Sequence, residues 1–285
     1  MRNSRQARWF VLLALFFVDA YALYALADAV PDETLTVAFL DVGQGDAVFI
    51  ETGSGRQMLV DGGPPNKKVL YELGKLMPAY DRTLDVVVAT HPDRDHIGGL
   101  SDVLRSYQVP LLLEPGLARD TSDYESLTAL LSEKDMKRII ARRGQRIYLE
   151  KNIFLDILSP EGVSDSADSN DASVIMKLSY GTQGFLLTGD APQAVEKRLV
   201  AREGKNLESE VLKAGHHGSK TSSSGMLLFA TEPDYTVISA GKDNQYGHPH
   251  AEVVARIEKT KSAVLRTDTL GTIIFKTDGR NLVVE

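Results

Sequence analysis

The chain has 285 residues, no cysteine and a formal net charge of −7. Without cysteine there can be no disulfide, thiolate zinc site or thiol nucleophile, so any metal ion must be held by histidine and carboxylate side chains. The negative charge argues against broad, non-specific binding of nucleic acid, but it excludes no nuclease, because bound cations would reverse the charge of an acidic site.

The amino terminus combines positive charge with an apolar segment. Three arginines within the first eight residues precede the apolar stretch 9–18, and Ala25-Leu26-Ala27 offers an A-x-A cleavage site. This pattern is typical of a secretory signal peptide. A membrane anchor is the alternative, although Asp19 would cost a span about 2.5–3.5 kcal/mol; a buried soluble helix is a third interpretation. A signal peptide or anchor within residues 1–28 predicts an extracytoplasmic protein, secreted or membrane-anchored.

Strands and helices then alternate along one large domain, residues 34–285, with a polar loop at 164–171. Periodicity predicts helices over 66–77, 99–107, 124–137 and 193–202. It predicts strands over 35–40, 47–52, 58–60, 84–89, 111–114, 144–149, 153–158, 172–179, 184–187, 237–240, 263–266, 271–276 and 282–284. Two similar runs of strands favour an α/β fold in which two sheets pack face to face with helices outside.

One short segment carries four potential metal ligands at the end of the predicted strand 84–89. They are His91, Asp93, Asp95 and His96. A loop that leaves a strand can direct imidazole and carboxylate groups at one point, and both suit a divalent cation. His91 and Asp93 form one pair of potential ligands, and Asp95 and His96 form another. Two pairs are more than one ion needs from so short a segment, so we expect two adjacent ions. The alternative is a solvated polar turn.

This segment resembles the H-x-[HD]-x-D-H signature of the metallo-β-lactamase family, and further landmarks of that family follow in order. They are Asp61-Gly62-Gly63, Thr188-Gly189-Asp190, Gly215-His216-His217-Gly218-Ser219 and Gly247-His248-Pro249-His250. The segment 40–47 and the aspartate at the second motif position resemble most the hydrolase domain at the C-terminal end of ComEC-type competence proteins. The resemblance covers roughly residues 34–285. It implies a four-layer αββα sandwich of two mixed β-sheets with helices outside.

The resemblance also implies a ligand set for two divalent ions, Mn²⁺ or Zn²⁺. His91 and Asp93 would bind the first ion, Asp95, His96 and a distal histidine the second, and Asp190 would bridge both. Of the two adjacent histidines, His216 is favoured as the distal ligand, and His217 would then face the substrate. Asp190 could instead cap the helix over 193–202.

Two departures from the family pattern concern the first ion. Asp93 stands where zinc β-lactamases carry histidine, and an oxygen ligand favours Mn²⁺ or Mg²⁺, although Zn²⁺ still binds more tightly. No histidine occurs between His96 and His216, so the usual third ligand is missing. Asn170, Asp171 or Ser173 lies in that region of the chain. We therefore expect the first ion to be held weakly.

The remaining candidates surround the expected ions. His248 is a last ligand, a phosphate-contacting acid or a structural residue. Ser219, Lys220 and Asn170 are candidates for phosphate contact, although serine-rich loops are usually just solvated. Asp61 and Asp46 are expected to hydrogen-bond the metal loop and orient its ligands.

These residues predict a metal-dependent hydrolase that attacks with a metal-bound hydroxide. The resemblance implies a phosphodiester in DNA as the preferred substrate, so that the protein would be a phosphodiesterase or nuclease that acts outside the cytoplasm. Asp95 would orient the nucleophile, and His248 or His217 would assist the leaving group. The expected partners are DNA or another phosphodiester, and the membrane through the N-terminal segment. Because the channel region of full ComEC is not in this sequence, we expect either a separate membrane channel as a partner or a free surface nuclease. The alternatives are a small-phosphoester hydrolase, for example of phosphorylcholine esters, and a non-catalytic module that binds metal or nucleic acid.

Overall fold

The computed structural model describes residues 9–10, 12–20, 33–164 and 166–285. Two units are distinguished, residues 1–33 and 34–285. In the first unit, the described residues 9–10 and 12–20 are helical. Across the described ranges, no helix combines the length and the apolar character needed to cross a membrane. Most of the predicted signal peptide or anchor lies outside the described residues, so it stays a prediction.

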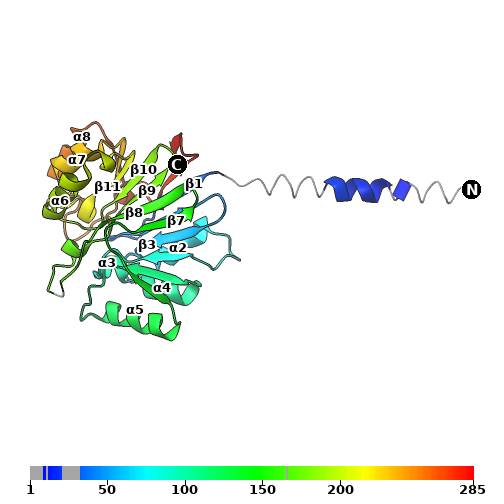
Figure 1. The fold of residues 1–285 in the computed structure, drawn as a ribbon, viewed down its shortest axis with the longest axis horizontal. Coiled ribbons are helices and arrows are strands. Elements are labelled where there is room, and N and C mark those ends of the chain that lie inside the picture. Colours follow the sequence, from blue (N-terminus) through cyan, green and yellow to red (C-terminus); the bar gives the residue numbers. More distant parts are fainter. Residues whose placement is uncertain (1–8, 11, 21–32, 165) are drawn as a thin grey trace, which may run out of the picture. The chain divides into compact units, whose positions relative to one another are not determined.

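The second unit is built on two mixed β-sheets (Figure 1). The eight-stranded sheet has the order β15 (Leu282–Val284), β14 (Ile273–Thr277), β1 (Leu35–Phe39), β2 (Val48–Glu51), β3 (Gln57–Val60), β4 (Val86–Val88), β5 (Leu111–Glu114) and β6 (Lys137–Ile140). The seven-stranded sheet has the order β13 (Ala263–Arg266), β12 (Tyr235–Ile238), β11 (Val211–Lys213), β10 (Gln183–Leu187), β9 (Ile175–Tyr180), β8 (Ile153–Ser159) and β7 (Arg146–Glu150).

Helices cover the outer face of each sheet. The first sheet carries α2 (Lys68–Leu76), α3 (Arg94–Ile97), α4 (Leu100–Ser106) and α5 (Ser122–Glu133). The second carries α6 (Gln193–Glu203), α7 (Gly225–Thr231) and α8 (Ala251–Glu258). Short elements complete the fold: α9 (Thr267–Leu270) and the 3₁₀ turns η1 (Asn170–Ala172), η2 (Gly204–Leu207) and η3 (Gly215–Gly218). The predicted four-layer α/β sandwich is confirmed.

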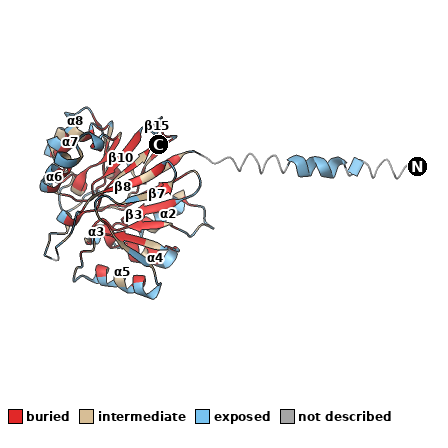
Figure 2. Ribbon diagram, in the orientation of Figure 1, coloured by how far each residue is buried: buried red, intermediate tan, exposed pale blue. Residues whose placement is uncertain are grey.

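The alternation of apolar residues explains the layers. In β1, Leu35, Val37 and Phe39 point into the core between the sheets, whereas Ala38 packs against the helices. Because successive side chains of a strand point to opposite faces, a strand buried on both sides is apolar throughout. Figure 2 shows these buried strands between helices whose outer faces are exposed.

Each sheet is parallel in one half and antiparallel in the other. Strands β3 to β6 are parallel in the first sheet, and β10 to β13 are parallel in the second. Loops that leave the carboxyl ends of parallel strands emerge at one edge of a sheet, which is where α/β proteins usually place their ligand sites. The candidate ligands follow β4, β10 and β11 at these ends.

The structure differs from the sequence prediction in a few elements. The predicted helix 124–137 ends at Glu133, because Asp135 adopts a positive φ of 48° and the chain then enters β6. The strand predicted over 237–240 lies at 235–238. Helices α7 and α8 were not predicted. The sequence did contain a start signal for α7, because Ser224 caps this helix by accepting a hydrogen bond from the backbone N–H of Leu227.

Candidate metal centre

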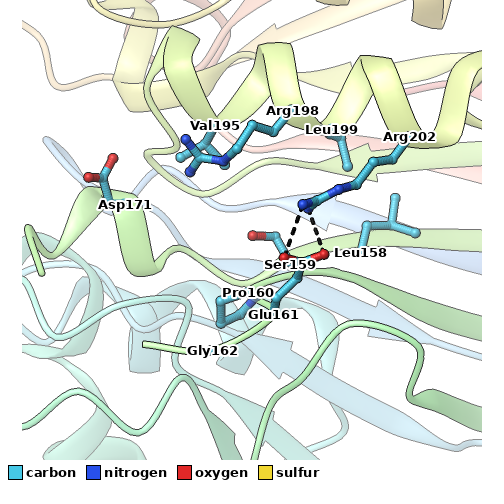
Figure 3. Close-up of a pocket in the computed structure, with 10 residues that line it drawn as sticks. All are labelled: Leu158, Ser159, Pro160, Glu161, Gly162, Asp171, Val195, Arg198, Leu199 and Arg202. Atoms are coloured by element: carbon cyan, nitrogen blue, oxygen red, sulfur yellow. Dashed lines mark hydrogen bonds and ion pairs between the residues drawn. The ribbon is translucent and has the colours of Figure 1, made fainter. Parts of the chain in front are cut away.

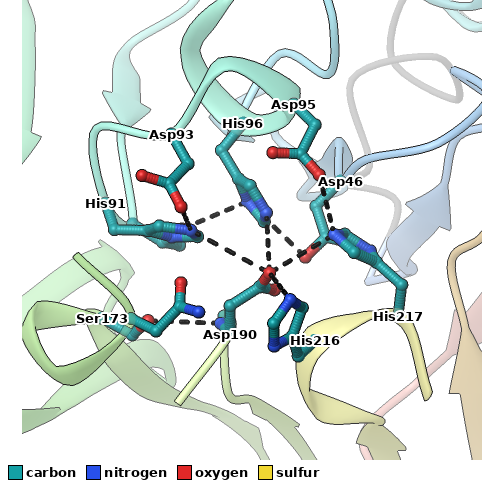
Figure 4. A network of polar contacts seen from close by, with 12 residues as sticks. Asp46, His91, Asp93, Asp95, His96, Ser173, Asp190, His216 and His217 are labelled. Carbon is teal, nitrogen blue, oxygen red and sulfur yellow. Dashed lines mark hydrogen bonds and ion pairs between the residues drawn. The ribbon is translucent and has the colours of Figure 1, made fainter. Parts of the chain in front are cut away.

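The carboxylate of Asp190 lies at the centre of the candidate site (Figure 4). Its Oδ2 atom is surrounded by imidazole Nε2 atoms, at 3.3 Å from His96, 3.4 Å from His217, 3.7 Å from His216 and 4.0 Å from His91. Asp190 follows β10, whereas His91 and His96 follow β4 of the other sheet. One buried carboxylate thus meets side chains from both halves of the domain.

Two of these histidines direct Nε2 at Asp190 and have Nδ1 held from behind. Nδ1 of His96 lies 2.8 Å from the Asp61 carboxylate, and Nδ1 of His217 lies 3.0 Å from the carbonyl oxygen of Ser239. Carboxylate and carbonyl oxygens only accept, so each Nδ1 must be the donor. In the neutral ring Nε2 is then unprotonated, which is the form that binds a metal ion.

Asp61 fixes His91 through a hydroxyl. Thr90 donates its Oγ1 hydrogen to Asp61 over 2.7 Å, and its backbone N–H donates to the same carboxylate over 2.7 Å. The Thr90 oxygen can therefore only accept from Nδ1 of His91, 2.9 Å away. Asp61 thus orients both histidines of the metal loop without entering the cluster itself, a role typical of residues that support metal ligands.

The donor set fits divalent ions. Nε2 of His91, His96 and His217 is buried and has no hydrogen-bond partner within the described residues, an arrangement that is costly unless a cation occupies the space between them. Ligand atoms of His91, His96 and Asp190 lie within 4.8 Å of one another, and so do those of Asp95, His96 and His217. Imidazole and carboxylate together suit Zn²⁺ or Mn²⁺.

The aspartates of the motif complete these groups. Oδ2 of Asp93 lies 3.6 Å from Nε2 of His91, and Oδ2 of Asp95 lies 3.2 Å from Nε2 of His217. The Asp93 side chain is 39% exposed and that of Asp95 is 33% exposed. The two carboxylates, together with the partly exposed His216, are therefore the groups around Asp190 that solvent and substrate can reach.

The two adjacent histidines differ in burial, and the buried one is His217, whereas the sequence favoured His216 as the ligand. His217 is 1% exposed and faces Asp95, whereas His216 is 28% exposed, with Nδ1 at 3.1 Å from Oγ1 of Thr221. Both residues adopt left-handed backbone angles, with φ of 50° and 54°. This conformation is strained for residues other than glycine. Nε2 of both rings lies near Asp190, but only His217 is buried.

A buried lysine, not identified from the sequence, lies behind the cluster. Nζ of Lys213 contacts the Asp46 carboxylate, lies 3.6 Å from Oδ1 of Asp190 and donates to the Gly189 carbonyl over 3.1 Å. The only sequence signal was a lysine that ends the apolar strand β11, three residues before His216. The site contains five carboxylates, those of Asp46, Asp61, Asp93, Asp95 and Asp190, and one lysine. With neutral histidines this leaves four negative charges, which two divalent cations would balance.

The pKa shifts follow from this charge. Burial opposes the charged form of His96 and His217, but Asp190 and the neighbouring aspartates outweigh burial and raise the pKa of both rings. For His91, burial and the charge of His96 lower the pKa to about 4. Burial alone would raise the pKa of Asp95, but His217 and His96 lower it to about 2. The carboxylates thus make a strongly cation-attracting site.

The region of the missing third histidine is filled by a serine. Ser173 is fully buried, and its Oγ accepts a hydrogen bond from the backbone N–H of Asp190 over 3.2 Å. Asn170 lies in η1, and its Oδ1 is buried without a hydrogen-bond partner among the described residues. Asp171 instead lines a separate cavity of about 100 Å³, and Arg202 and Glu161, which form an ion pair, also line it (Figure 3).

The serine-rich loop takes a largely structural form. Ser219 is buried and accepts a hydrogen bond from the Thr221 hydroxyl over 3.0 Å. The Lys220 side chain is exposed, while its backbone N–H donates to Nδ1 of His250 over 3.3 Å. Of the expected phosphate contacts, Lys220 is the accessible one.

His248 lies beside the cluster without entering it. Its ring centroid is 5.5 Å from that of His216 and 6.3 Å from that of His217. Burial and the two neighbouring rings lower its pKa to about 4, so the ring is neutral at pH 7. It is therefore placed to hydrogen-bond a substrate but not to act as a charged acid.

Comparisons with known proteins agree with this geometry. The model of the metallo-beta-lactamase superfamily matches residues 40–242. The chain is 32% identical over 261 residues to ComE operon protein 3 of Bacillus subtilis, covering 86% of this chain and 33% of that protein. It is also 32% identical over 268 residues to competence protein ComA of Neisseria gonorrhoeae, covering 94% and 35%. The chain therefore spans about a third of the length of these curated relatives.

A solved structure shows the same fold. The metallo-beta-lactamase fold protein YhfI from Bacillus subtilis superposes with a TM-score of 0.57 at 14% identity, covering 86% of this chain and 100% of YhfI. At this identity the similarity concerns the fold alone.

Proposed function

Because the chain belongs to the metallo-β-lactamase superfamily of metal-dependent hydrolases, we propose that it is a phosphodiesterase that cleaves DNA outside the cytoplasm. The observation that carries the hydrolase chemistry is the set of buried imidazole Nε2 atoms that converge on Asp190 without hydrogen-bond partners among the described residues. Such a set has little structural use unless cations are bound there.

The geometry supports one assignment of ligands. His91 and Asp93 would hold a first ion, and Asp95, His96 and His217 a second, with Asp190 between them. Nε2 of His216 lies 3.7 Å from Asp190 and would offer a further nitrogen ligand. When bound, two such ions lower the pKa of water toward neutrality and polarise a phosphoryl oxygen.

Side chains of the protein would orient the water molecule, contact the substrate and hold the carboxylates in place. Asp95 is ionised at pH 7, because its pKa is lowered to about 2, and its carboxylate stays accessible to orient an incoming water molecule by accepting a hydrogen bond. Neutral His248 can hydrogen-bond a phosphate oxygen or the leaving group. Lys213 keeps Asp46 and Asp190 in place from the buried side.

DNA is the proposed substrate because the curated relatives are named as competence proteins. The same names support a membrane channel for DNA uptake as a further proposed partner. Action outside the cytoplasm is supported by the arginines and the apolar stretch of the N-terminal sequence. Fusion of residues 1–33 to alkaline phosphatase, which is active only after export, tests this location; an inactive but stable fusion would contradict it.

The activity itself is tested with metal-stripped full-length protein, reconstituted with Mn²⁺ or Zn²⁺ and analysed for bound metal. The substrates are single- and double-stranded DNA, RNA and p-nitrophenyl phosphorylcholine. We expect metal-dependent cleavage of DNA. Cleavage of the phosphorylcholine ester alone would indicate a small-phosphoester hydrolase, and bound metal without any turnover would indicate a binding module.

A further inference from the structure

We propose that the groove beside the metal cluster binds a nucleobase of single-stranded DNA, stacked on Tyr246, next to the phosphate that is cleaved. This inference rests on the proposed nuclease function and adds the part of the substrate that the site recognises. It concerns an open groove of about 580 Å³, a volume suited to a nucleotide-sized ligand.

The groove is continuous with the metal cluster. Asp95, a candidate ligand, forms part of its wall, as do Arg94 beside it and Gln44 from the loop between β1 and β2. Tyr246 and Asn244 line it from the loop that follows β12. A strand whose phosphate lies at the cluster would therefore enter this groove with its neighbouring nucleotide.

Tyr246 offers an aromatic surface at a suitable place. Its ring stacks on His248, with centroids 5.7 Å apart and an angle of 24° between the planes, and the residue is nevertheless 57% exposed. The His248 ring in turn lies 6.3 Å from that of His217 in the cluster. Tyr246 is thus two ring contacts from a candidate metal ligand, near enough to stack a base that flanks the reacting phosphate.

The loop that carries Tyr246 is fixed before any ligand binds. Asn244 donates to the carbonyl oxygens of Gly241 and His248, over 2.9 and 2.5 Å, and accepts from the backbone N–H groups of Tyr246 and His248, over 3.1 and 3.0 Å. An exposed tyrosine on a surface loop would ordinarily be mobile. These four bonds hold its backbone in place, which lowers the entropic cost of stacking a base.

Arg94 is the one cationic side chain among the described residues that line the groove, where Asp95 and Asp243 are acidic. The Arg94 side chain is 76% exposed, and its Nε is 3.5 Å from Asp123, which leaves much of the guanidinium available for a phosphate. Aromatic stacking combined with such contacts is the usual way of binding single strands without sequence preference. In a duplex the base faces are already stacked, so the groove predicts a preference for single-stranded over double-stranded DNA.

The test compares Tyr246→Leu with Tyr246→Phe, which keeps the ring. Tyr80→Leu is the matched control, because Tyr80 is an exposed tyrosine that does not line the groove. Each full-length protein is assayed on a single-stranded oligonucleotide and on the same oligonucleotide with abasic positions. Binding is followed separately in EDTA through a 2-aminopurine base, whose fluorescence is quenched by stacking.

For Tyr246→Leu we expect kcat/KM on the intact oligonucleotide to fall roughly tenfold, the range for loss of one stacked base, with little change on the abasic one and loss of the quench. Tyr246→Phe and Tyr80→Leu should behave like the wild type. Equal losses on both oligonucleotides would show an indirect effect through His248 and overturn the inference, as would an unchanged Tyr246→Leu variant. If the wild type cleaves no DNA but the fluorescence quench still depends on Tyr246, the nuclease proposal is wrong and the base-binding groove is supported. If there is neither cleavage nor a quench that depends on Tyr246, both proposals are wrong.

Discussion

His216 and His217 are neighbours in the chain, yet their side chains occupy opposite environments: 28% of the first is exposed and only 1% of the second. The cause is local, since both residues adopt left-handed backbone angles within η3. His217 is held by the Ser239 carbonyl and His216 by the Thr221 hydroxyl. Substituting each histidine in turn therefore compares the effect of a buried candidate ligand with that of its more accessible neighbour.

We expect His217→Ala to lose more bound metal than His216→Ala. The buried imidazole belongs to a group of potential ligands with Asp95 and His96, whereas His216 lies 3.7 Å from Asp190 and belongs to no such group among the described residues. Metal per protein is measured by elemental analysis after dialysis against a weak chelator. Equal metal contents, or the opposite order, would contradict the assignment of His217.

Asp190→Asn should reduce hydrolysis of the best phosphodiester at least about 100-fold, because even residues that only orient metal ligands contribute 10–100-fold. Oδ2 of Asp190 faces four imidazole nitrogens, and an amide cannot supply the charge that attracts two ions. Asp156→Asn, on an exposed ion pair with Arg146, is the control. Near wild-type turnover in Asp190→Asn would refute a two-ion site.

Asp61→Asn should weaken metal binding by roughly 10- to 100-fold without removing any ligand. The Asp61 carboxylate accepts from Thr90 and His96, so an amide nitrogen would face one of these donors and release its histidine. Titration of the stripped protein with Mn²⁺ measures the affinity. Asp41→Asn, at a half-buried aspartate outside the cluster, should leave the affinity unchanged; a similar loss there would argue for a general effect on folding.

Lys213→Met should destabilise the metal-free protein by about 3–5 kcal/mol, since it leaves buried carboxylates without their partner. Bound cations should offset part of this loss, so the rise in melting temperature on adding metal should be larger than in the wild type. Lys276→Met removes an exposed pair with Glu285 and should cost about 1 kcal/mol or less. Chemical denaturation in EDTA and in Mn²⁺ compares the variants, and equal stabilities of the two would contradict the role of Lys213.

Activity on DNA should be higher with Mn²⁺ than with Zn²⁺. Asp93 supplies an oxygen where related zinc enzymes have nitrogen, and Ser173, not a histidine, lies beside Asp190. Oxygen-rich sites favour hard, six-coordinate ions that keep exchangeable water molecules. Reconstitution of the stripped protein with each metal provides the measurement. Full activity with Zn²⁺ and none with Mn²⁺ would reverse this expectation.

Much of the fold and of the metal loop could be predicted because their signals are local. The alternation in β1 defines two buried faces, and His91, Asp93, Asp95 and His96 are close in sequence because one loop carries them. The end of helix α5 was harder to place, because the apolar pattern continues into β6 and only the positive φ of Asp135 interrupts it.

The other features depend on tertiary structure. The choice between His216 and His217 is set by two strained backbone angles that no side-chain pattern encodes. Lys213 was missed because a lysine at a strand end is usually solvated, and only the packing of the sheets buries it against Asp46. Tyr246 likewise acquires its place beside the cluster from a loop held by Asn244.

The origin of the ligands in both sheets has a consequence for the lifetime of the protein. His96 and Asp190 lie far apart in the sequence, so an ion that joins them closes a long loop of the chain, much as a covalent cross-link would. An ion that binds only the folded form also shifts the unfolding equilibrium toward that form. Metal supply would then decide how long the molecule resists proteases, so that a metal-starved cell would keep less of this protein as well as a less active one.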